Sequence, residues 1–205
     1  MNMGQKPGQT IDPGTRKGAP GDLAVVQSFI NTADLRPGKE ELGDPAALKA
    51  WFLAHGLLDR HERLTDADLR HALEVREALR DLLVANDDGT PSHAAIQTLS
   101  RAARGAHVVV QFDANGKAAL RSAATGVDAA LGRLLAITTE SMIDGSWERL
   151  KACGDETCRW AFYDWSKNHS SAWCAMESCG NRVKARRYRS RQLVKKRSDR
   201  ARDRR

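Results

Sequence analysis

The sequence predicts an α+β fold that is mostly α-helical. An α-rich N-terminal domain with one β-hairpin is followed by a small cysteine-containing module and a basic C-terminal helix. Apolar residues recur at helical spacing in several segments before residue 145. Residues 107–122 read as two strands around the turn Asn115-Gly116. All four cysteines lie between residues 153 and 179. The 205 residues suit one ordinary domain with a small appendage, and a hydrophobic content of 41% excludes wholesale disorder.

The N-terminal end divides into an arm and a first helix. Residues 1–21 hold five Gly and three Pro with almost no bulky apolar side chains, so we expect a disordered arm. Leu23, Val26 and Ile30 then recur at helical spacing. Asp22 precedes them, and its carboxylate is expected to cap the free N–H groups of this helix.

The next two helices carry start and stop signals. After a turn at Pro37-Gly38, Asp44-Pro45 predicts a capped helix start and Gly56 its end. A long helix is expected from about Thr65 to Ala85. Its predicted apolar stripe consists of Leu69, Ala72, Leu73, Leu79 and Leu83. The charged residues expected to face elsewhere are Glu74, Arg76, Glu77 and Arg80.

Two further helices flank the predicted hairpin. One begins at Thr90-Pro91 and carries Ile96 and Leu99 on its apolar side. The other runs from Val127 to Ile143. Together with the earlier elements they complete an N-terminal domain over residues 22–145.

The cysteines form two close pairs, Cys153-x4-Cys158 and Cys174-x4-Cys179, separated by fifteen residues. Two such pairs supply the corners of a tetrahedron, which predicts one structural Zn²⁺ bound by all four thiolates. An iron–sulfur centre or a redox disulfide is the alternative. Because four protein ligands leave no open position for a water molecule, the site is expected to hold structure rather than to catalyse.

Residues 146–192 are expected to form a small zinc module. RWAFYDW predicts a strand after the first cysteine pair, and a helix is predicted from Gly180 onward. The order of knuckle, hairpin, second cysteine pair and helix is typical of a treble-clef-like finger. Six of the eleven aromatic residues lie between Trp147 and Trp173, and we expect them to close the core around the metal.

The C-terminal residues are strongly basic. Residues 182–205 hold 13 Lys or Arg against two acids, a net charge of +11, whereas residues 1–181 carry a net charge of −4. Such a helix and the basic tail at 193–205 are expected to bind a polyanion, with double-stranded DNA as the first candidate. The candidate contact residues are Arg182, Lys184, Arg186, Arg187, Arg189, Arg191 and Lys195. An RNA-binding or protein-interaction adaptor is the alternative. The helix has no broad apolar face, which argues against a membrane surface.

Polar residues follow the first helix, where Asn31, Thr32 and Arg36 could bind a small-molecule effector. In the competing interpretation, Asn31 and Thr32 end the helix through local hydrogen bonds while Arg36 pairs with a carboxylate. The histidines are dispersed, and neither a Gly-rich phosphate loop nor an H-E-x-x-H pattern occurs. An enzyme in this domain, with the cysteine module as an accessory, is a further alternative, but the sequence favours a protein without catalytic activity.

Two segments resemble known families. Cys179-Gly180-Asn181-Arg182, preceded by the Cys153/Cys158 pair and by FYD at 162–164, resembles the CGNR-type zinc finger. FINTADLRPGKEELGDPAALKAWFLAHGLL resembles the ABATE domain that usually precedes this finger. The resemblance implies a bacterial, stress-responsive transcription regulator with a DNA-binding finger at 146–192. We expect residues 22–145 to act as a sensor or dimerisation domain, and a homodimer is one expected assembly. The loop SKNHSSAW departs from the arginine-rich pattern of the family, which shifts phosphate contacts toward the C-terminal helix.

The sequence also suggests a cellular location. No run of 18 apolar residues occurs, and the first 21 residues lack the continuous apolar core of a secretory signal. We therefore expect a cytoplasmic protein, associated with the nucleoid if it binds DNA.

Overall fold

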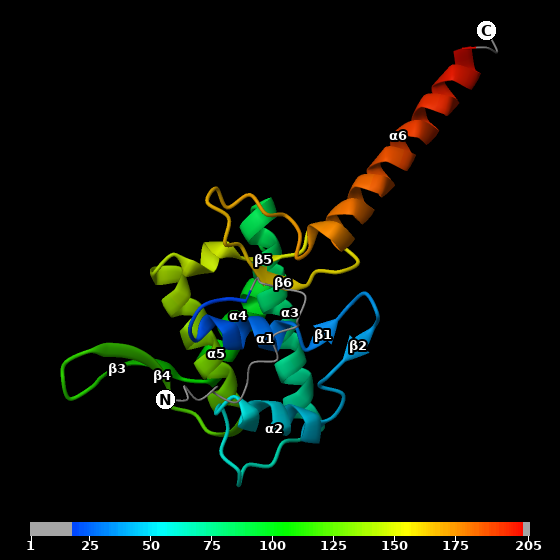
Figure 1. The fold of residues 1–205 in the computed structure, drawn as a ribbon. Coiled ribbons are helices and arrows are strands. Elements are labelled where there is room, and N and C mark those ends of the chain that lie inside the picture. The colour runs from blue at the N-terminus through cyan, green and yellow to red at the C-terminus, as the bar shows by residue number, and fades with distance from the viewer. Residues whose placement is uncertain (1–17, 203–205) are drawn as a thin grey trace, which may run out of the picture.

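The computed structural model describes residues 18–202, with side chains described up to residue 192 except that of Asp88. The fold is α+β and mostly α-helical, as predicted, and the elements follow one another as shown in Figure 1. The α-helices are α1 (Leu23–Ile30), α2 (Pro45–Ala54), α3 (Asp66–Asp88), α4 (His93–Gly105), α5 (Gly126–Ile143) and α6 (Asn181–Arg202). The strands are β1 (Ala33–Asp34), β2 (Lys39–Glu40), β3 (Val108–Phe112), β4 (Ala118–Ser122), β5 (Leu150–Ala152) and β6 (Ala161–Tyr163). A 3₁₀ turn, Ser146–Arg149, precedes β5, and a π turn, Met176–Gly180, precedes α6.

Local capping explains where several helices begin. Asp44 accepts a hydrogen bond from the Ala47 N–H at 2.8 Å, which starts α2 as predicted. Thr65 and Asp68 form a reciprocal capping box at the start of α3. Ser92 caps α4, so this helix begins slightly later than the predicted Thr90-Pro91. The predicted cap at Asp22 was wrong, because its backbone is already helical and its side chain makes no capping hydrogen bond.

Three antiparallel ribbons of two strands each connect or flank the described helices: β1–β2, β3–β4 and β5–β6. The predicted turn at Pro37-Gly38 joins β1 to β2, two strands that the sequence did not indicate. The predicted hairpin is present, with Val110 opposite Leu120 at its centre. The third ribbon pairs Lys151 with Phe162.

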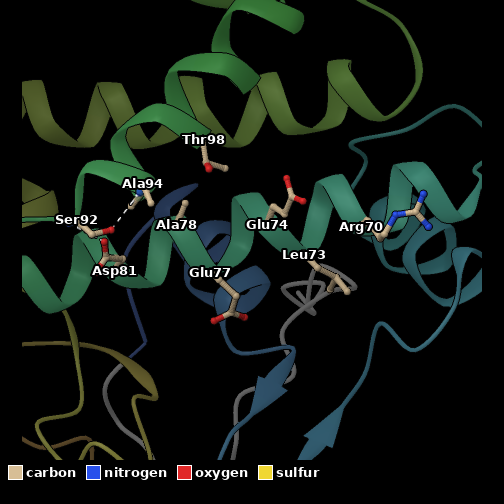
Figure 2. A pocket seen from close by; sticks show the side chains of 10 residues that line it. Arg70, Leu73, Glu74, Glu77, Ala78, Asp81, Ser92, Ala94 and Thr98 are labelled. Carbon is tan, nitrogen blue, oxygen red and sulfur yellow. Dashed lines mark hydrogen bonds between the residues drawn. The ribbon is translucent and has the colours of Figure 1, made fainter.

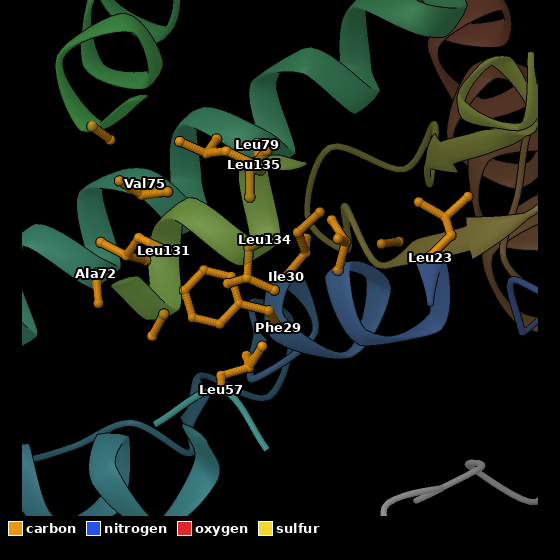
Figure 3. Packing of buried hydrophobic residues seen from close by; sticks show 14 of the residues in the cluster. Leu23, Phe29, Ile30, Leu57, Ala72, Val75, Leu79, Leu131, Leu134 and Leu135 are labelled. Carbon is orange, nitrogen blue, oxygen red and sulfur yellow. The ribbon is translucent and has the colours of Figure 1, made fainter. Parts of the chain in front are cut away.

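The main core lies among α1, α3 and α5, where Phe29, Leu79 and Leu134 are fully buried (Figure 3). The same core continues into β5 and β6 through Leu150 and Tyr163. The ribbon of the cysteine module therefore packs into the N-terminal domain rather than folding apart from it. Burying these side chains removes apolar surface from water across the whole junction, which couples the two parts energetically.

Two sequence expectations about helix faces were wrong. Arg76 and Arg80, placed on the outer side of α3, are buried at 4% and 5% exposure. Arg76 makes a bidentate ion pair with Glu40 of β2 at 2.7 Å, and Arg80 donates to the Ile30 and Ala33 carbonyl groups. Their charges are tolerated inside because carboxylates and carbonyl groups accept hydrogen bonds from both guanidinium groups, although Arg80 Nε has no partner among the described residues. Conversely, Ile96 of α4 is exposed, since Ala95 and Ala102 form the buried side.

Helix α6 extends away from the body, and its first turns are the part that contacts the rest of the chain (Figure 1). Val183 is buried at its base, whereas Tyr188 further along is exposed. Among the described helices, none combines the length and the apolar character needed to cross a bilayer. The predicted arm at 1–21 lies mostly outside the described residues. Its last part contacts the body, where the Gly18 carbonyl accepts a hydrogen bond from Trp165 and the Ala19 N–H donates to Gln27.

Candidate zinc centre and nucleic-acid interface

The first cysteine pair lies in the loop between β5 and β6. The Cys153 N–H donates to the Trp160 carbonyl at 2.9 Å, and the Cys158 N–H donates to the Asp155 carbonyl at 2.7 Å. These bonds fold the loop so that both sulfurs point to one side. The sequence suggested that the knuckle precedes the hairpin, but the hairpin in fact encloses the knuckle, because β5 comes before Cys153.

The second pair lies just before α6. The Ala172 carbonyl accepts a hydrogen bond from the Gly154 N–H at 2.8 Å, which ties this segment to the first knuckle. Cys179 occupies the π turn that leads into α6. The next residue is Gly180. A side chain is disfavoured at this position, because a Cβ there would collide with Met176 Sδ and lie 3.4 Å from the Trp173 ring. The metal ligand and the start of the basic helix are therefore only two residues apart.

The four sulfurs form one compact buried cluster, with all of them within 4.8 Å of one another. Cys158 Sγ lies 3.8 Å from Cys174 Sγ, which lies 3.7 Å from Cys179 Sγ. A tetrahedral ion with sulfur ligands at about 2.3 Å requires sulfur–sulfur edges of about 3.8 Å. The cluster can therefore bind one zinc ion through Cys153, Cys158, Cys174 and Cys179, as the sequence predicted.

The ionisation of the thiols supports the same conclusion. Hydrogen bonds from Cys158 and Cys174 lower the pKa of the Cys153 thiol to about 2. Their shared hydrogen bonds with Cys153 raise the pKa of Cys158 to about 12 and also raise the pKa of Cys174. Among these three thiols, the mutual hydrogen bonds therefore favour the thiolate at Cys153 and oppose it at Cys158 and Cys174. Four thiolates require the positive charge of a dication, which is the chemistry of a structural zinc site.

The aromatic residues of the module divide between two cores. Trp160, Phe162 and Trp173 pack around the cysteines, as expected. Trp147 and Tyr163 belong instead to the main core. The expectation that all six aromatic side chains surround the metal was therefore wrong, because the strands of β5–β6 present one face to each core.

Asp155 links the first knuckle to α6. Its side chain is fully buried and accepts hydrogen bonds from Arg186 Nη2 at 2.8 Å and Thr157 Oγ1 at 2.9 Å. Arg182 Nη1 lies 3.7 Å from its other oxygen. Burial disfavours the charged carboxylate, but the bonds from Arg186 and Thr157 outweigh this and hold the pKa of Asp155 below its ordinary value. Asp155 therefore fixes the first two turns of α6 against the metal loop.

This ion pair divides the basic residues of α6 into two sides. Arg182 and Arg186 face inward to Asp155, and at 100° per residue Arg189 lies on their side of the helix. Lys184, Arg187 and Arg191 lie on the opposite side and are exposed. We call these three the outer basic face. The side chain of Lys195 lies outside the described residues.

The three candidate effector residues contact the chain itself. The Asn31 amide donates to the Ala161 carbonyl at 2.9 Å and accepts from its N–H at 2.8 Å, which fastens α1 to β6. Thr32 Oγ1 donates to the Phe29 carbonyl and accepts from Arg76. The local helix-ending bond suggested for Thr32 is therefore present, whereas the Asn31 side chain bonds across to β6.

Arg36 reaches the zinc centre. Its Nη1 lies 3.7 Å from Cys179 Sγ in hydrogen-bonding geometry. Burial opposes its charge, but the Cys158 and Cys179 sulfurs outweigh this and raise the pKa of the guanidinium. Arg36 thus brings a positive charge from the N-terminal domain to a cluster that is negative when ionised.

The loop before the third cysteine is organised around Lys151. Lys151 Nζ donates to the His169 carbonyl at 2.6 Å and lies 3.4 Å from the buried Asp164 carboxylate. Burial raises the pKa of Asp164, but hydrogen bonds from Ser166 and Ser171 more than offset this and lower it. Lys151 Nζ also lies 3.6 Å from Asp87 Oδ1, so the charge of Lys151 is paired with two carboxylates.

An open hollow of about 540 Å³ lies between α3 and α4 (Figure 2). Leu73, Ala78 and Thr98 form part of its lining, with Glu74 and Glu77 along α3. Glu77 also forms ion pairs with the buried Arg76 and Arg80. Asn31, Thr32 and Arg36 do not line this hollow.

With the geometry in place, comparison with protein families decides the relationship. The ABATE model, described as "Putative stress-induced transcription regulator", matches residues 23–144. The model of the CGNR zinc finger matches residues 149–192. This chain is a member of the ABATE family. It carries a CGNR zinc finger after its ABATE domain, in the order that the sequence resemblance implied. A search among curated proteins found none that matches the chain.

For this ABATE protein, the four metal ligands and the basic residues all fall within the matched finger, except Lys195. Asp155, which holds α6, also lies inside it. Asn31 and Arg36 lie in the ABATE match, and both reach across to the finger. The two family segments therefore form one continuous structure through these contacts and through the shared core.

Proposed function

We propose that this ABATE protein is a DNA-binding transcription regulator without catalytic activity, acting in the cytoplasm at the nucleoid. The observation that carries the proposal is the placement of α6. The helix starts two residues after zinc ligand Cys179, is held by Asp155 and projects from the body with Lys184, Arg187 and Arg191 exposed on one side. A positively charged helix that is held in a fixed direction can lie against DNA phosphates or enter a major groove.

The zinc ion supplies structure in this proposal. When bound, it joins the knuckle of β5–β6 to the turn before α6. The chain's own residues then set the direction of the helix. Asp155 accepts a hydrogen bond from Arg186, and Val183 is buried at the base of the helix. The exposed bases beyond these contacts remain available to phosphates. Their mutual repulsion would be relieved by a polyanion, with release of counterions.

The ABATE domain is the sensing part of the proposed regulator. The open hollow between α3 and α4 offers room for a small effector, and Glu77 connects its lining to the buried Arg76. Arg76 in turn holds Glu40 on the β1–β2 ribbon, whose turn region carries Arg36 to Cys179. This contiguous series of contacts supports communication between the hollow and the finger.

Duplex binding provides the direct test. The zinc-loaded full chain is titrated with salt in the presence of a random duplex pool or the corresponding single strands, and bound duplexes are selected and sequenced. We expect tighter binding to duplex, enrichment of a preferred sequence and a log–log salt slope at least as steep as about −3, because the three outer bases contribute about 0.9 each and the basic tail can add further contacts. Preferential binding of single strands would support the RNA-binding alternative through the exposed rings of Trp165 and Tyr188. Equal affinity for every nucleic acid, with no enriched sequence, would contradict a regulator.

Replacing Asp155 with asparagine tests how α6 is positioned. The change removes an acid, so a simple charge argument predicts tighter DNA binding. We expect weaker sequence-selective binding instead, because Arg182 and Arg186 lose the partner that orients the helix. Since both arginines are partly exposed, the loss of stability should be modest, about 1–2 kcal/mol.

The matched control for this variant is Glu156→Gln, which makes the same charge change at the neighbouring exposed residue. Zinc content, thermal unfolding and affinity for the selected duplex are measured for both variants. If Asp155→Asn and Glu156→Gln behave alike, the positioning role of Asp155 is wrong.

A further inference from the structure

The β3–β4 hairpin has an open edge. It is a two-stranded sheet in which β4 packs against α5, whereas β3 forms the outer strand (Figure 1). The Asp113 N–H donates to the Lys117 carbonyl, and the Ala123 N–H donates to the His107 carbonyl. Residues alternate along an antiparallel strand, so Val108, Val110 and Phe112 direct their N–H and C=O groups away from β4. Among the described residues, no strand pairs with this edge.

The edge also lacks the features that normally prevent association. Strand β3 reads VVVQF, with no charge and no proline. Val110 is 59% exposed and Phe112 is 68% exposed. Natural edge strands are usually protected by lysine, proline, a bulge or a covering element. An apolar, β-branched edge of this kind favours pairing with another strand.

We propose that β3 pairs antiparallel with β3 of a second copy, which joins two hairpins into a four-stranded sheet. The sequence is self-complementary for this arrangement when Val110 faces Val110 of the other copy across a two-fold axis. Val108 then faces Phe112, so that aliphatic and aromatic side chains meet on one face. A single two-fold interface satisfies both copies equally.

The contact is small, because each copy contributes only one five-residue strand edge and its exposed side chains. It is therefore expected below the usual size of about 800 Å² per partner, which is typical of a weak or transient dimer. The dimer deepens the proposed function, since two basic helices could then engage two half-sites on DNA. Its existence does not depend on DNA binding and is tested without DNA.

Register-specific crosslinking tests the pairing in the full zinc-loaded chain. Val110→Cys places two thiols opposite each other at a Cα separation of about 5.5 Å, within the range for a disulfide. Val109→Cys is the matched control, because residue 109 faces residue 111 in this register and its thiols are offset. Under mild oxidation, we expect crosslinked dimer to form several-fold more with Val110→Cys. Equal crosslinking of the two variants, or none, would overturn the register.

The oligomeric state gives an independent measurement. Sedimentation from about 1 to about 100 µM protein should show a monomer–dimer equilibrium for the unmodified chain. Val110→Lys should shift it to monomer, because two lysines would face each other at the axis. Ile143→Lys, at an exposed apolar position on α5, should leave the dimer intact. A chain that is monomeric throughout, or a dimer lost only with Ile143→Lys, would refute the β3 interface. Failure of DNA binding with an intact dimer would contradict the proposed function alone.

Discussion

Replacing Cys174 with serine is expected to abolish stoichiometric zinc binding and, with it, the binding of duplex DNA. Cys174 Sγ lies within 3.8 Å of two other ligand sulfurs. Its loss therefore removes one of the four ligands of the tetrahedral site. Structural zinc sites contribute about 10–16 kcal/mol of apparent binding free energy, and a three-ligand site retains only part of it. Without the ion, the segment that starts α6 is no longer held to the first knuckle.

The damage should extend beyond the finger. Leu150 and Tyr163 flank the cysteine loop in sequence but are packed in the core formed by α1, α3 and α5. Asn31 adds two hydrogen bonds to β6. If the finger were a separate folding unit, its loss would leave the N-terminal domain folded. The shared core instead predicts a lower melting temperature for the whole chain.

Elemental analysis, thermal unfolding and gel shifts on the variant measure these effects. Ser170→Ala is the control, because it changes an exposed serine of the same module without removing a ligand. Chelation of the unmodified protein should reproduce the Cys174→Ser result, and added zinc should reverse it. A Cys174→Ser protein with one tightly bound zinc and unchanged DNA affinity would contradict the proposed coupling.

The parts of the fold that sequence predicted are those controlled by neighbouring residues. Asp44 caps α2 and Thr65 caps α3, and each partner is three residues away. The hairpin was readable because its turn residues and its strands are contiguous. Burial of Arg76 could not be predicted, since its partners Thr32 and Glu40 are 44 and 36 residues away. A charged residue on a helix is normally exposed, so only the tertiary structure reveals that this one is paired inside.

The candidate site also combines local features that the sequence predicted with distant contacts that it did not. The spacing of the cysteines predicted the metal ligands, because each pair closes through a short loop. The role of Asp155 was missed, although an acid between two ligands and an arginine-rich helix was a usable signal. Its partner Arg186 is 31 residues away, and which arginines turn inward depends on the rotation of α6. Arg36 was singled out as a candidate effector-binding residue. Its contact with Cys179 could not be predicted, because the two residues are 143 positions apart in the sequence.

Neutralising Arg187 and Arg191 together is expected to weaken duplex binding and to lower the steepness of its salt dependence by about two. Both side chains are exposed on the outer basic face, so the double Arg→Gln change removes two expected phosphate contacts and breaks no bond found among the described side chains. Each phosphate contact contributes about 0.9 to the log–log salt slope. The ratio of the variant's dissociation constant to that of the unmodified protein should therefore fall by about tenfold between about 50 and about 200 mM salt. Zinc content and melting temperature should stay the same.

The inward pair provides a control of equal charge on the same helix. Arg182→Gln with Arg186→Gln also removes two positive charges, but it breaks both ion pairs with the buried Asp155. An unpaired buried carboxylate is costly, so this variant should melt at a lower temperature. If DNA binding depended only on the net charge of α6, the two double variants would give the same salt slope. The outer basic face would then have no special role. A large change in slope for the outer pair, together with a change mainly in stability for the inner pair, would instead show that Asp155 determines which side of α6 meets DNA.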